Sequence, residues 1–156
     1  MAAAAAEIRR AAPEERARIL EVSRRTIRAA YGPILGQSGV DRYAASAEHD
    51  AYFDTQADTT FVITDGGAVA GVSVLRANMV DLLLIDPEHQ GKGLGTLLLA
   101  AMEAELFRDF DPIALESWKA NSRANRFWLE RGWTTIGETA DERTGAPKLM
   151  FMKGRT

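Results

Sequence analysis

The stretch from residue 79 to residue 107 constrains the fold more than any other part of the chain. It begins with a run that is more continuously apolar than the neighbouring strands, residues 79–85, and such a run is typical of a central strand buried on both faces. Three glycines then alternate over residues 91–95, and the apolar residues from Leu94 to Phe107 predict a helix. This succession predicts an α/β sheet with a tight glycine turn between a buried strand and a helix.

The rest of the chain also divides into strand-like and helix-like segments. The signal Tyr31-Gly32-Pro33 is expected to end the first helix, with a loop at residues 34–38. The order predicts one domain over residues 1–156, with an α/β (α+β) fold and a mixed, mostly antiparallel sheet of about seven strands flanked by four helices. The expected strands are residues 7–11, 59–64, 68–75, 79–85, 113–118, 133–138 and 149–153, and the expected helices are residues 13–30, 40–53, 94–107 and 122–131.

Composition excludes several kinds of site. The 156 residues include no cysteine, so disulfides, thiolate metal sites and a cysteine nucleophile are excluded. His49 and His89 are too few for a histidine-rich site, and we expect no metal. The net charge of −3 argues against nucleic-acid binding by bulk electrostatics. No apolar run approaches the roughly 20 residues of a membrane span, and the alanines at residues 2–6 lack the basic flank of a signal peptide. We therefore expect a cytoplasmic protein with no membrane or nucleic-acid partner.

The glycines suit a loop that holds a bulky anion. Gly91, Gly93 and Gly95 allow the backbone to approach a ligand and to turn successive N–H groups toward it. The start of the following helix adds partial positive charge. Lys92 adds a cation and Thr96 a hydroxyl, so the loop fits a pyrophosphate, although a ligand-free strand-to-helix turn can have the same pattern.

Two common phosphate motifs do not match the spacing. A Walker A loop requires Gly-x-x-x-x-Gly-Lys-Ser/Thr, which does not fit here. The dinucleotide fingerprint requires Gly-x-Gly-x-x-Gly, and here the third glycine comes one residue early. That fingerprint normally follows the first strand of a parallel unit, unlike this loop. A nucleotide-binding structural protein remains an alternative that a comparison of ligands would decide.

Two blocks of the chain resemble the GNAT superfamily of N-acetyltransferases. The first is Gln90-Gly91-Lys92-Gly93-Leu94-Gly95, which matches the family's Gln/Arg-x-x-Gly-x-Gly/Ala between its fourth strand and third helix. The second is residues 115–133 (LESWKANSRANRFWLERGW), which resembles the family's strand, asparagine, short helix and Gly-aromatic ending. The resemblance implies the GNAT fold and acetyl-coenzyme A as co-substrate.

The resemblance also implies which residues hold the cofactor. The backbone of the fourth strand would pair with the pantetheine arm as an added strand does, and the N–H groups of the glycine loop would hold the pyrophosphate. Asn121 would hydrogen-bond the arm, or it is simply the N-cap of the helix that starts at Ser122. The implied set is Leu83, Leu84, Ile85, Gln90, Gly91, Lys92, Gly93, Leu94, Gly95, Thr96 and Asn121.

The implied reaction is direct attack of a primary amine on a thioester in a ternary complex. An amine with a pKa of about 10.4 is protonated at pH 7, and freeing its lone pair costs about 4 to 5 kcal/mol. A base is therefore useful, and an N–H donor, for which Ile85 is the candidate, stabilises the developing oxyanion.

Two carboxylates are candidate bases. Glu116 matches a glutamate that serves as base in ribosomal-protein N-terminal acetyltransferases, and Asp81 lies on the fourth strand, where other members place an acid. Strand alternation predicts that Asp81 shares the face of Leu83 and Ile85. Each can also be a solvated or ion-paired strand residue.

One position departs from the family pattern. The leaving thiolate is usually protonated by a tyrosine on the fourth helix, and this chain has Trp128 there. An indole N–H only donates hydrogen bonds at neutral pH, and Trp128 is most simply a core residue. Water, Tyr31 or Tyr43 are alternative proton donors. A non-catalytic acyl-coenzyme A-binding module is therefore the alternative to an enzyme.

The acceptor side is expected at the first two helices. Residues 37–58 hold five carboxylates against Arg42, and such a patch either attracts a cationic amine or is a solvated helix face. The sequence predicts an amine acceptor and a monomer or homodimer, without identifying the amine. The carboxylates are Asp41, Glu48, Asp50, Asp54 and Asp58, and the aromatic residues available for a pocket are Tyr31, Tyr43, Tyr52, Phe53 and Trp118.

Overall fold

The computed structural model describes residues 6–156, so nearly all of the alanine run at residues 2–6 lies outside the described residues. In chain order, the elements are β1 (Glu7–Arg10), η1 (Pro13–Glu15), α1 (Arg16–Leu35), α2 (Gln37–Ala44), α3 (Ala47–Thr55), η2 (Ala57–Thr59), β2 (Thr60–Asp65), β3 (Ala68–Arg76), β4 (Met79–Ile85), η3 (Pro87–His89), α4 (Leu94–Phe107), β5 (Ile113–Trp118), α5 (Ser122–Glu130), β6 (Thr134–Ala140) and β7 (Pro147–Lys153).

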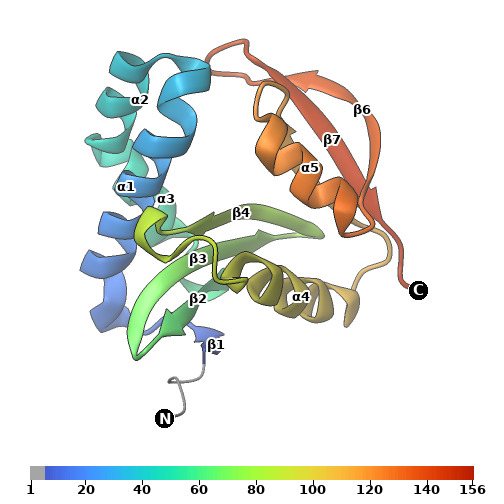
Figure 1. The fold of residues 1–156 in the computed structure, drawn as a ribbon, viewed down its shortest axis with the longest axis horizontal. Helices are drawn as coiled ribbons and strands as arrows, with labels where there is room; N and C mark the ends of the chain where they lie inside the picture. Colours follow the sequence, from blue (N-terminus) through green and yellow to red (C-terminus); the bar gives the residue numbers. More distant parts are fainter. Residues whose placement is uncertain (1–5) are drawn as a thin grey trace.

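The strands form one seven-stranded sheet in the order β1-β2-β3-β4-β5-β7-β6 (Figure 1). β4 and β5 pair in parallel, and the other neighbouring strands are antiparallel. The expected mixed, mostly antiparallel sheet is confirmed. The parallel pair of β4 and β5 lies near the centre of the sheet, and β4 is the strand that precedes η3 and the glycine loop.

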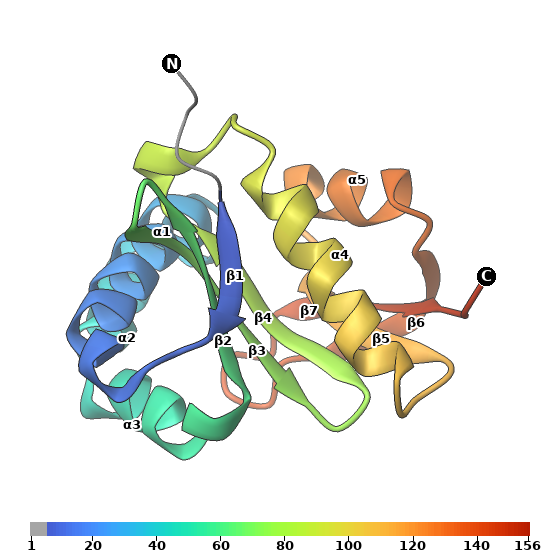
Figure 2. The ribbon, with the colours of Figure 1, turned by 90° about the horizontal axis from the view of Figure 1, so that it is seen from below.

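Helices cover both faces of the sheet (Figures 1 and 2). On one face α1 packs with α2 and α3 over a core that includes Val22 and Val72, both fully buried. On the other face α4 and α5 cover a second core that includes Leu98, Met102 and Leu115. Each such side chain contributes about 1.5–3 kcal/mol by burial. None of the helices in residues 6–156 is long and apolar enough to cross a membrane.

The first helix is longer than expected. α1 continues through Tyr31-Gly32-Pro33 and ends at Leu35, where the N–H of Gly36 donates to the Gly32 carbonyl over 3.0 Å. Tyr31 and Leu35 pack against the core beneath α1, and this tertiary packing outweighs the local ending signal. Pro33 lies in the last turn and has no N–H, so that turn lacks one backbone hydrogen bond.

The expected helix at residues 40–53 is two helices, α2 and α3. Ser46 separates them, because its Oγ accepts the backbone N–H of His49 over 3.2 Å and caps α3. The expected loop at residues 34–38 is also wrong. α1 ends at Leu35 and α2 already begins at Gln37, so only Gly36 lies between the two helices. The described part of the chain therefore has five α-helices rather than four.

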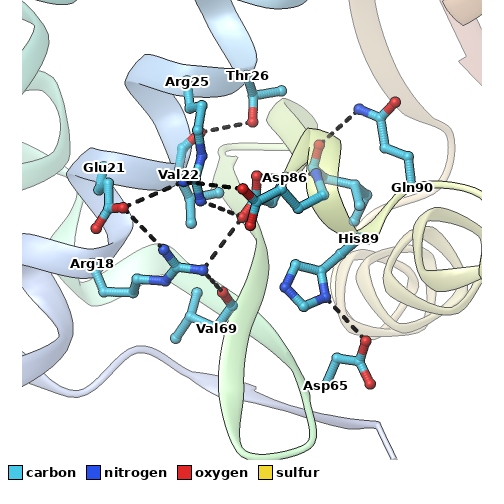
Figure 3. A network of polar contacts seen from close by, with 12 residues as sticks. Arg18, Glu21, Val22, Arg25, Thr26, Asp65, Val69, Asp86, His89 and Gln90 are labelled. Atoms are coloured by element: carbon cyan, nitrogen blue, oxygen red, sulfur yellow. Dashed lines mark hydrogen bonds and ion pairs between the residues drawn. The ribbon is translucent and has the colours of Figure 1, made fainter.

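A buried carboxylate joins α1 to the end of β4 (Figure 3). Asp86 has no exposed surface, and its Oδ2 accepts hydrogen bonds from Arg25 Nη2 over 2.6 Å and from Arg18 Nη2 over 3.3 Å. Its backbone N–H donates to the Ala70 carbonyl in β3 over 2.8 Å. A buried charge is stable only when it is paired in this way, so the contact fixes α1 against the sheet.

Replacing this carboxylate is expected to destabilise the fold. Asp86→Ala leaves two guanidinium groups without their shared partner, and the free energy of unfolding is expected to fall by about 3 kcal/mol. Urea denaturation measures the loss. Glu88→Ala is the matched control, because Glu88 is 71% exposed and lies 3.9 Å from the same Arg25. Its loss is expected to stay below about 1 kcal/mol, and equal losses in both variants would contradict the role of Asp86.

Candidate active site

The site begins where β4 and β5 separate. The two strands share one register pair, Met79 with Ala114, and among the described residues the rest of β4 pairs only with β3. The N–H of Asp86 points to β3, where it donates to Ala70. Because successive N–H groups of a strand point to opposite sides, the N–H of Ile85 points into the gap toward β5. The Ile85 carbonyl on the same side accepts Gln90 Nε2 over 2.9 Å. The N–H groups of this edge of β4 are therefore open to an extended ligand.

A cavity of about 1500 Å³ occupies this gap and extends beneath α1, α2 and α3. It joins the glycine loop and the starts of α4 and α5 to the aromatic side chains of the first three helices. The predicted site residues that line it are Asp81, Leu83, Leu84, Ile85, Gln90, Gly91, Gly93, Leu94, Gly95, Thr96, Glu116 and Asn121. The predicted donor and acceptor halves thus meet in one space.

The glycine loop has the backbone geometry of an anion site. Gly91 and Gly93 have φ values of 82° and 80°, in the left-handed region that glycine adopts without strain. The space where a Cβ would stand is open at both positions. Gly93 is the N-cap of α4, so the first N–H groups of that helix lack partners within it and are available to a ligand.

The side chain of Lys92 points elsewhere in this structure. Its Nζ donates to Asp65 Oδ2 over 2.8 Å, at the end of β2. His89 Nδ1 lies 3.0 Å from the same oxygen (Figure 3). The hydrogen bonds from Lys92 and then His89 hold the pKa of Asp65 below its ordinary value. The Lys92 ammonium is therefore neutralised beside the loop and does not line the cavity.

Arg131 supplies a cation that the sequence did not indicate. Its Nη2 and Nε donate to Thr96 Oγ1 over 2.8 Å and 3.1 Å, and its guanidinium lies 3.8 Å from the centroid of the Phe127 ring. Arg131 lines the cavity beside the start of α4. No local motif marks it, because α5 returns it to the glycine loop only in the folded chain.

Asn121 caps α5. Its Oδ1 accepts the N–H of Ala124 over 3.2 Å, so the capping interpretation is confirmed. The residue also lines the cavity. The same asparagine thus orders the start of α5 and faces the space between β4 and β5.

Asp81 occupies a β-bulge, and the bulge changes the face of the sheet on which its side chain lies. The pairing of β3 with β4 skips Asp81. Its Oδ2 accepts the hydroxyl of Tyr52 over 2.5 Å, on the α1 side of the sheet, and its Oδ1 accepts Arg76 Nη2 over 3.2 Å. Leu83 and Ile85 pack on the opposite, α4 side. The expectation that Asp81 shares their face is therefore wrong.

Glu116 faces the same side of the sheet as Asp81. Its neighbour Leu115 is buried in the α4-side core, so alternation turns Glu116 toward α1. Its carboxylate is 35% exposed and forms an ion pair with Lys148, whose Nζ is 3.5 Å away. That ammonium also lies 3.3 Å from Asp141 Oδ1 and 4.8 Å from the centroid of the Trp118 ring. Glu116 is thus less firmly held than Asp81.

Trp128 is a core residue, as expected. It is 8% exposed and packs edge to face against Phe127 and Trp133. Its Nε1 is buried and has no hydrogen-bond partner among the described residues. The side chain also lines the cavity, so the departure from tyrosine lies at the site itself.

The five carboxylates of residues 37–58 do not form an open acidic surface. Four of them form ion pairs, three with arginines of α1 and one with an arginine after β6. They fasten α2 and α3 in place, and their charge is largely neutralised. The pairs are Asp41 with Arg28, Glu48 with Arg143, Asp50 with Arg24 and Asp54 with Arg16.

A buried hydrogen-bonded chain adds to this fastening. Ser23 Oγ lies 2.8 Å from His49 Nε2, and His49 Nδ1 lies 2.9 Å from Asp50 Oδ1. Ser23 and His49 are 0% and 1% exposed, and both line the cavity, so the chain links α1 to α3 within the cavity wall. The hydrogen bond from His49 is the main cause that lowers the pKa of Asp50.

Three tyrosines line the cavity, and burial raises the pKa of each. The pKa of Tyr31 rises to about 12, and that of Tyr43 also lies above its ordinary value. The pKa of Tyr52 is raised by burial and by its hydrogen bond to Asp81. Tyr31 and Tyr43 are therefore weaker proton donors than an exposed tyrosine.

This burial predicts the alkaline behaviour of the protein. At a pH of about 10, where a free tyrosine is half ionised, the folded protein is expected to show almost no tyrosinate absorbance, and urea should release it. Because the folded state keeps protons that the unfolded state loses, the free energy of unfolding should fall as the pH rises above about 10. Substantial tyrosinate at that pH in the folded protein would contradict the burial.

Comparison with known proteins identifies the family. A sequence profile described as an acetyltransferase (GNAT) domain matches residues 35–149. No curated protein sequence matches the chain.

Among solved structures, a GCN5-related N-acetyltransferase from Rhodopseudomonas palustris superposes with a TM-score of 0.85 at 20% identity, covering 99% of each chain. PaiA N-acetyltransferase from Thermoplasma acidophilum, solved with coenzyme A, has a TM-score of 0.81 at 16% identity and covers 97% of this chain and 100% of its own. The ribosomal-protein-S18-alanine N-acetyltransferase from Escherichia coli has a TM-score of 0.71 at 15% identity and covers 96% and 94%. The fold is shared with these enzymes, and the profile match shows that the chain belongs to the GNAT acetyltransferase family.

Proposed function

We propose that the chain is an N-acetyltransferase that moves the acetyl group of acetyl-coenzyme A to a primary amine by direct attack in a ternary complex. The observation that carries the proposal is the single cavity that joins the glycine loop to Glu116 and Asp81. Membership of the family supports the acetyl transfer. The N-acetyltransferase activity named for the similar structures supports an amine as acceptor.

The donor half would bind the cofactor mainly through backbone groups. The free edge of β4 at Leu83–Ile85 suits the amides of the pantetheine arm, and the N–H groups from Gly91 to Thr96 suit the pyrophosphate. Arg131 adds a positive charge close to the same loop. The N–H of Ile85 would donate to the oxyanion that develops on the thioester carbonyl.

The acceptor half would free the amine for attack. Glu116 is the better base of the two candidates, because its carboxylate has one long ion pair. Both oxygens of Asp81 already accept hydrogen bonds, from Tyr52 and Arg76, so Asp81 would position the acceptor rather than take its proton. The ammonium would give one proton to Glu116. The nitrogen would then attack the carbonyl carbon as the C–S bond breaks, and its second proton would pass to the thiolate.

The glycine loop is tested by ligand binding. Gly93→Ala forces an alanine toward the left-handed region at a cost of roughly 1–2 kcal/mol. We therefore expect coenzyme A to bind about tenfold more weakly, as measured by calorimetry. Gly145→Ala, in the β6–β7 loop at a φ of 73°, carries similar strain outside the cavity and should leave the affinity unchanged. Tighter binding of ATP or NAD than of coenzyme A would favour a nucleotide-binding protein instead.

The base is tested by turnover. The wild-type protein, acetyl-coenzyme A and a panel of primary amines should release free thiol, and Glu116→Gln should slow this release about a hundredfold or more. The affinity for coenzyme A should not change, which separates loss of chemistry from loss of binding. An unchanged rate would remove Glu116 as the base. Tight binding without turnover on any amine would favour a non-catalytic acyl-coenzyme A-binding module, the alternative that Trp128 motivates.

A further inference from the structure

We propose that Lys148 is an internal acceptor, so that the protein acetylates its own Lys148 Nζ inside the cavity. The inference rests on the proposed acetyl transfer and names one amine that this site accepts. Lys148 is the second residue of β7, and it pairs with Trp118 of β5 in the sheet register. Its side chain lines the same cavity as the open edge of β4 and the glycine loop.

The position of the ammonium meets one requirement of an attacking amine, which is a carboxylate within reach to take its proton. Lys148 Nζ lies 3.5 Å from Glu116, the carboxylate proposed to take the proton. It also lies 3.3 Å from Asp141 and 4.8 Å from the centroid of the Trp118 ring. Two carboxylates and an indole face make an alkylammonium site, and the structure shows the chain's own alkylammonium group in it.

The other three lysines of the chain have different surroundings. Lys92 and Lys119 are each 53% exposed and pair with Asp65 and Glu138. Lys153 donates to Glu103 and to a backbone carbonyl. None of these three lines the cavity. Position in the cavity, rather than exposure, therefore singles out Lys148, whose side chain is only 22% exposed.

The step balances without any further reactant. The Lys148 ammonium gives one proton to Glu116, and its nitrogen attacks the carbonyl carbon of the thioester. The C–N bond forms, the C–S bond breaks, and the second proton passes from the nitrogen to the thiolate. The products are acetyl-Lys148, free coenzyme A and one proton on Glu116, which returns to water. The modified side chain has no charge, so the ion pairs with Glu116 and Asp141 are lost.

The experiment follows the mass of the full chain during incubation with acetyl-coenzyme A and no added amine. We expect a gain of one acetyl group, mapped to Lys148 by peptide mass spectrometry. Glu116→Gln should slow the gain about a hundredfold. Lys148→Arg, which keeps the positive charge, should abolish it. Lys119 is the internal control, because uncatalysed acetylation favours this more exposed amine.

Each outcome decides the proposal. Acetylation of Lys119 as fast as that of Lys148, or a rate at Lys148 that Glu116→Gln leaves unchanged, would overturn it as an uncatalysed reaction. Turnover of free amines while Lys148 stays unmodified would overturn the self-acetylation alone. Modification of Lys148 without turnover of any free amine would support the self-acetylation. It would overturn only the proposal that the site accepts an external amine. No acetyl transfer of either kind would overturn both proposals.

Discussion

The buried carboxylate of Asp86 sets the relation between the two halves of the site. It lies at the end of β4, immediately before the glycine loop, and its partners Arg18 and Arg25 belong to α1 (Figure 3). A charge without exposed surface needs both guanidinium groups, so α1 has little freedom to slide over the sheet. Because α1 also forms a wall of the cavity, one interaction fixes the distance between the glycine loop and that wall.

One half of the site is formed by backbone groups and the other half by side chains. The proposed donor side consists of strand-edge and loop N–H groups, whose directions follow from the divergence of β4 from β5 and from the φ values of Gly91 and Gly93. The acceptor side consists of side chains brought together from α1, α2, α3, β5 and the β6–β7 loop. The backbone N–H donors are present in any sequence that keeps the strand and the glycines. Side-chain walls change with every substitution, so one donor site can serve many acceptors.

This difference explains what could be predicted from the sequence. The strands, α4 and the glycine loop were predictable because their signals are local periodicity and glycine spacing. The end of α1 was not, because Tyr31 packs edge to face on Trp118, far away in the sequence. The face of Asp81 was not, because a bulge in the pairing of β3 with β4 breaks the alternation. Arg131 and Lys148 become site residues only through contacts that tertiary packing creates.

The carboxylates on the acceptor side are not equivalent, and their partners decide what each can do. Asp81 is held by Tyr52 and Arg76, and Asp141 Oδ2 accepts both the N–H and the hydroxyl of Thr144 over 2.9 Å. Tyr52 and Thr144 line the cavity, whereas Arg76 does not. The partner of Glu116 is an alkylammonium group, which is the chemical group that acetylation neutralises. In the proposed reaction, the positive charge that draws an amine toward Glu116 would disappear when the amide forms, so the site would bind the substrate amine more strongly than its product.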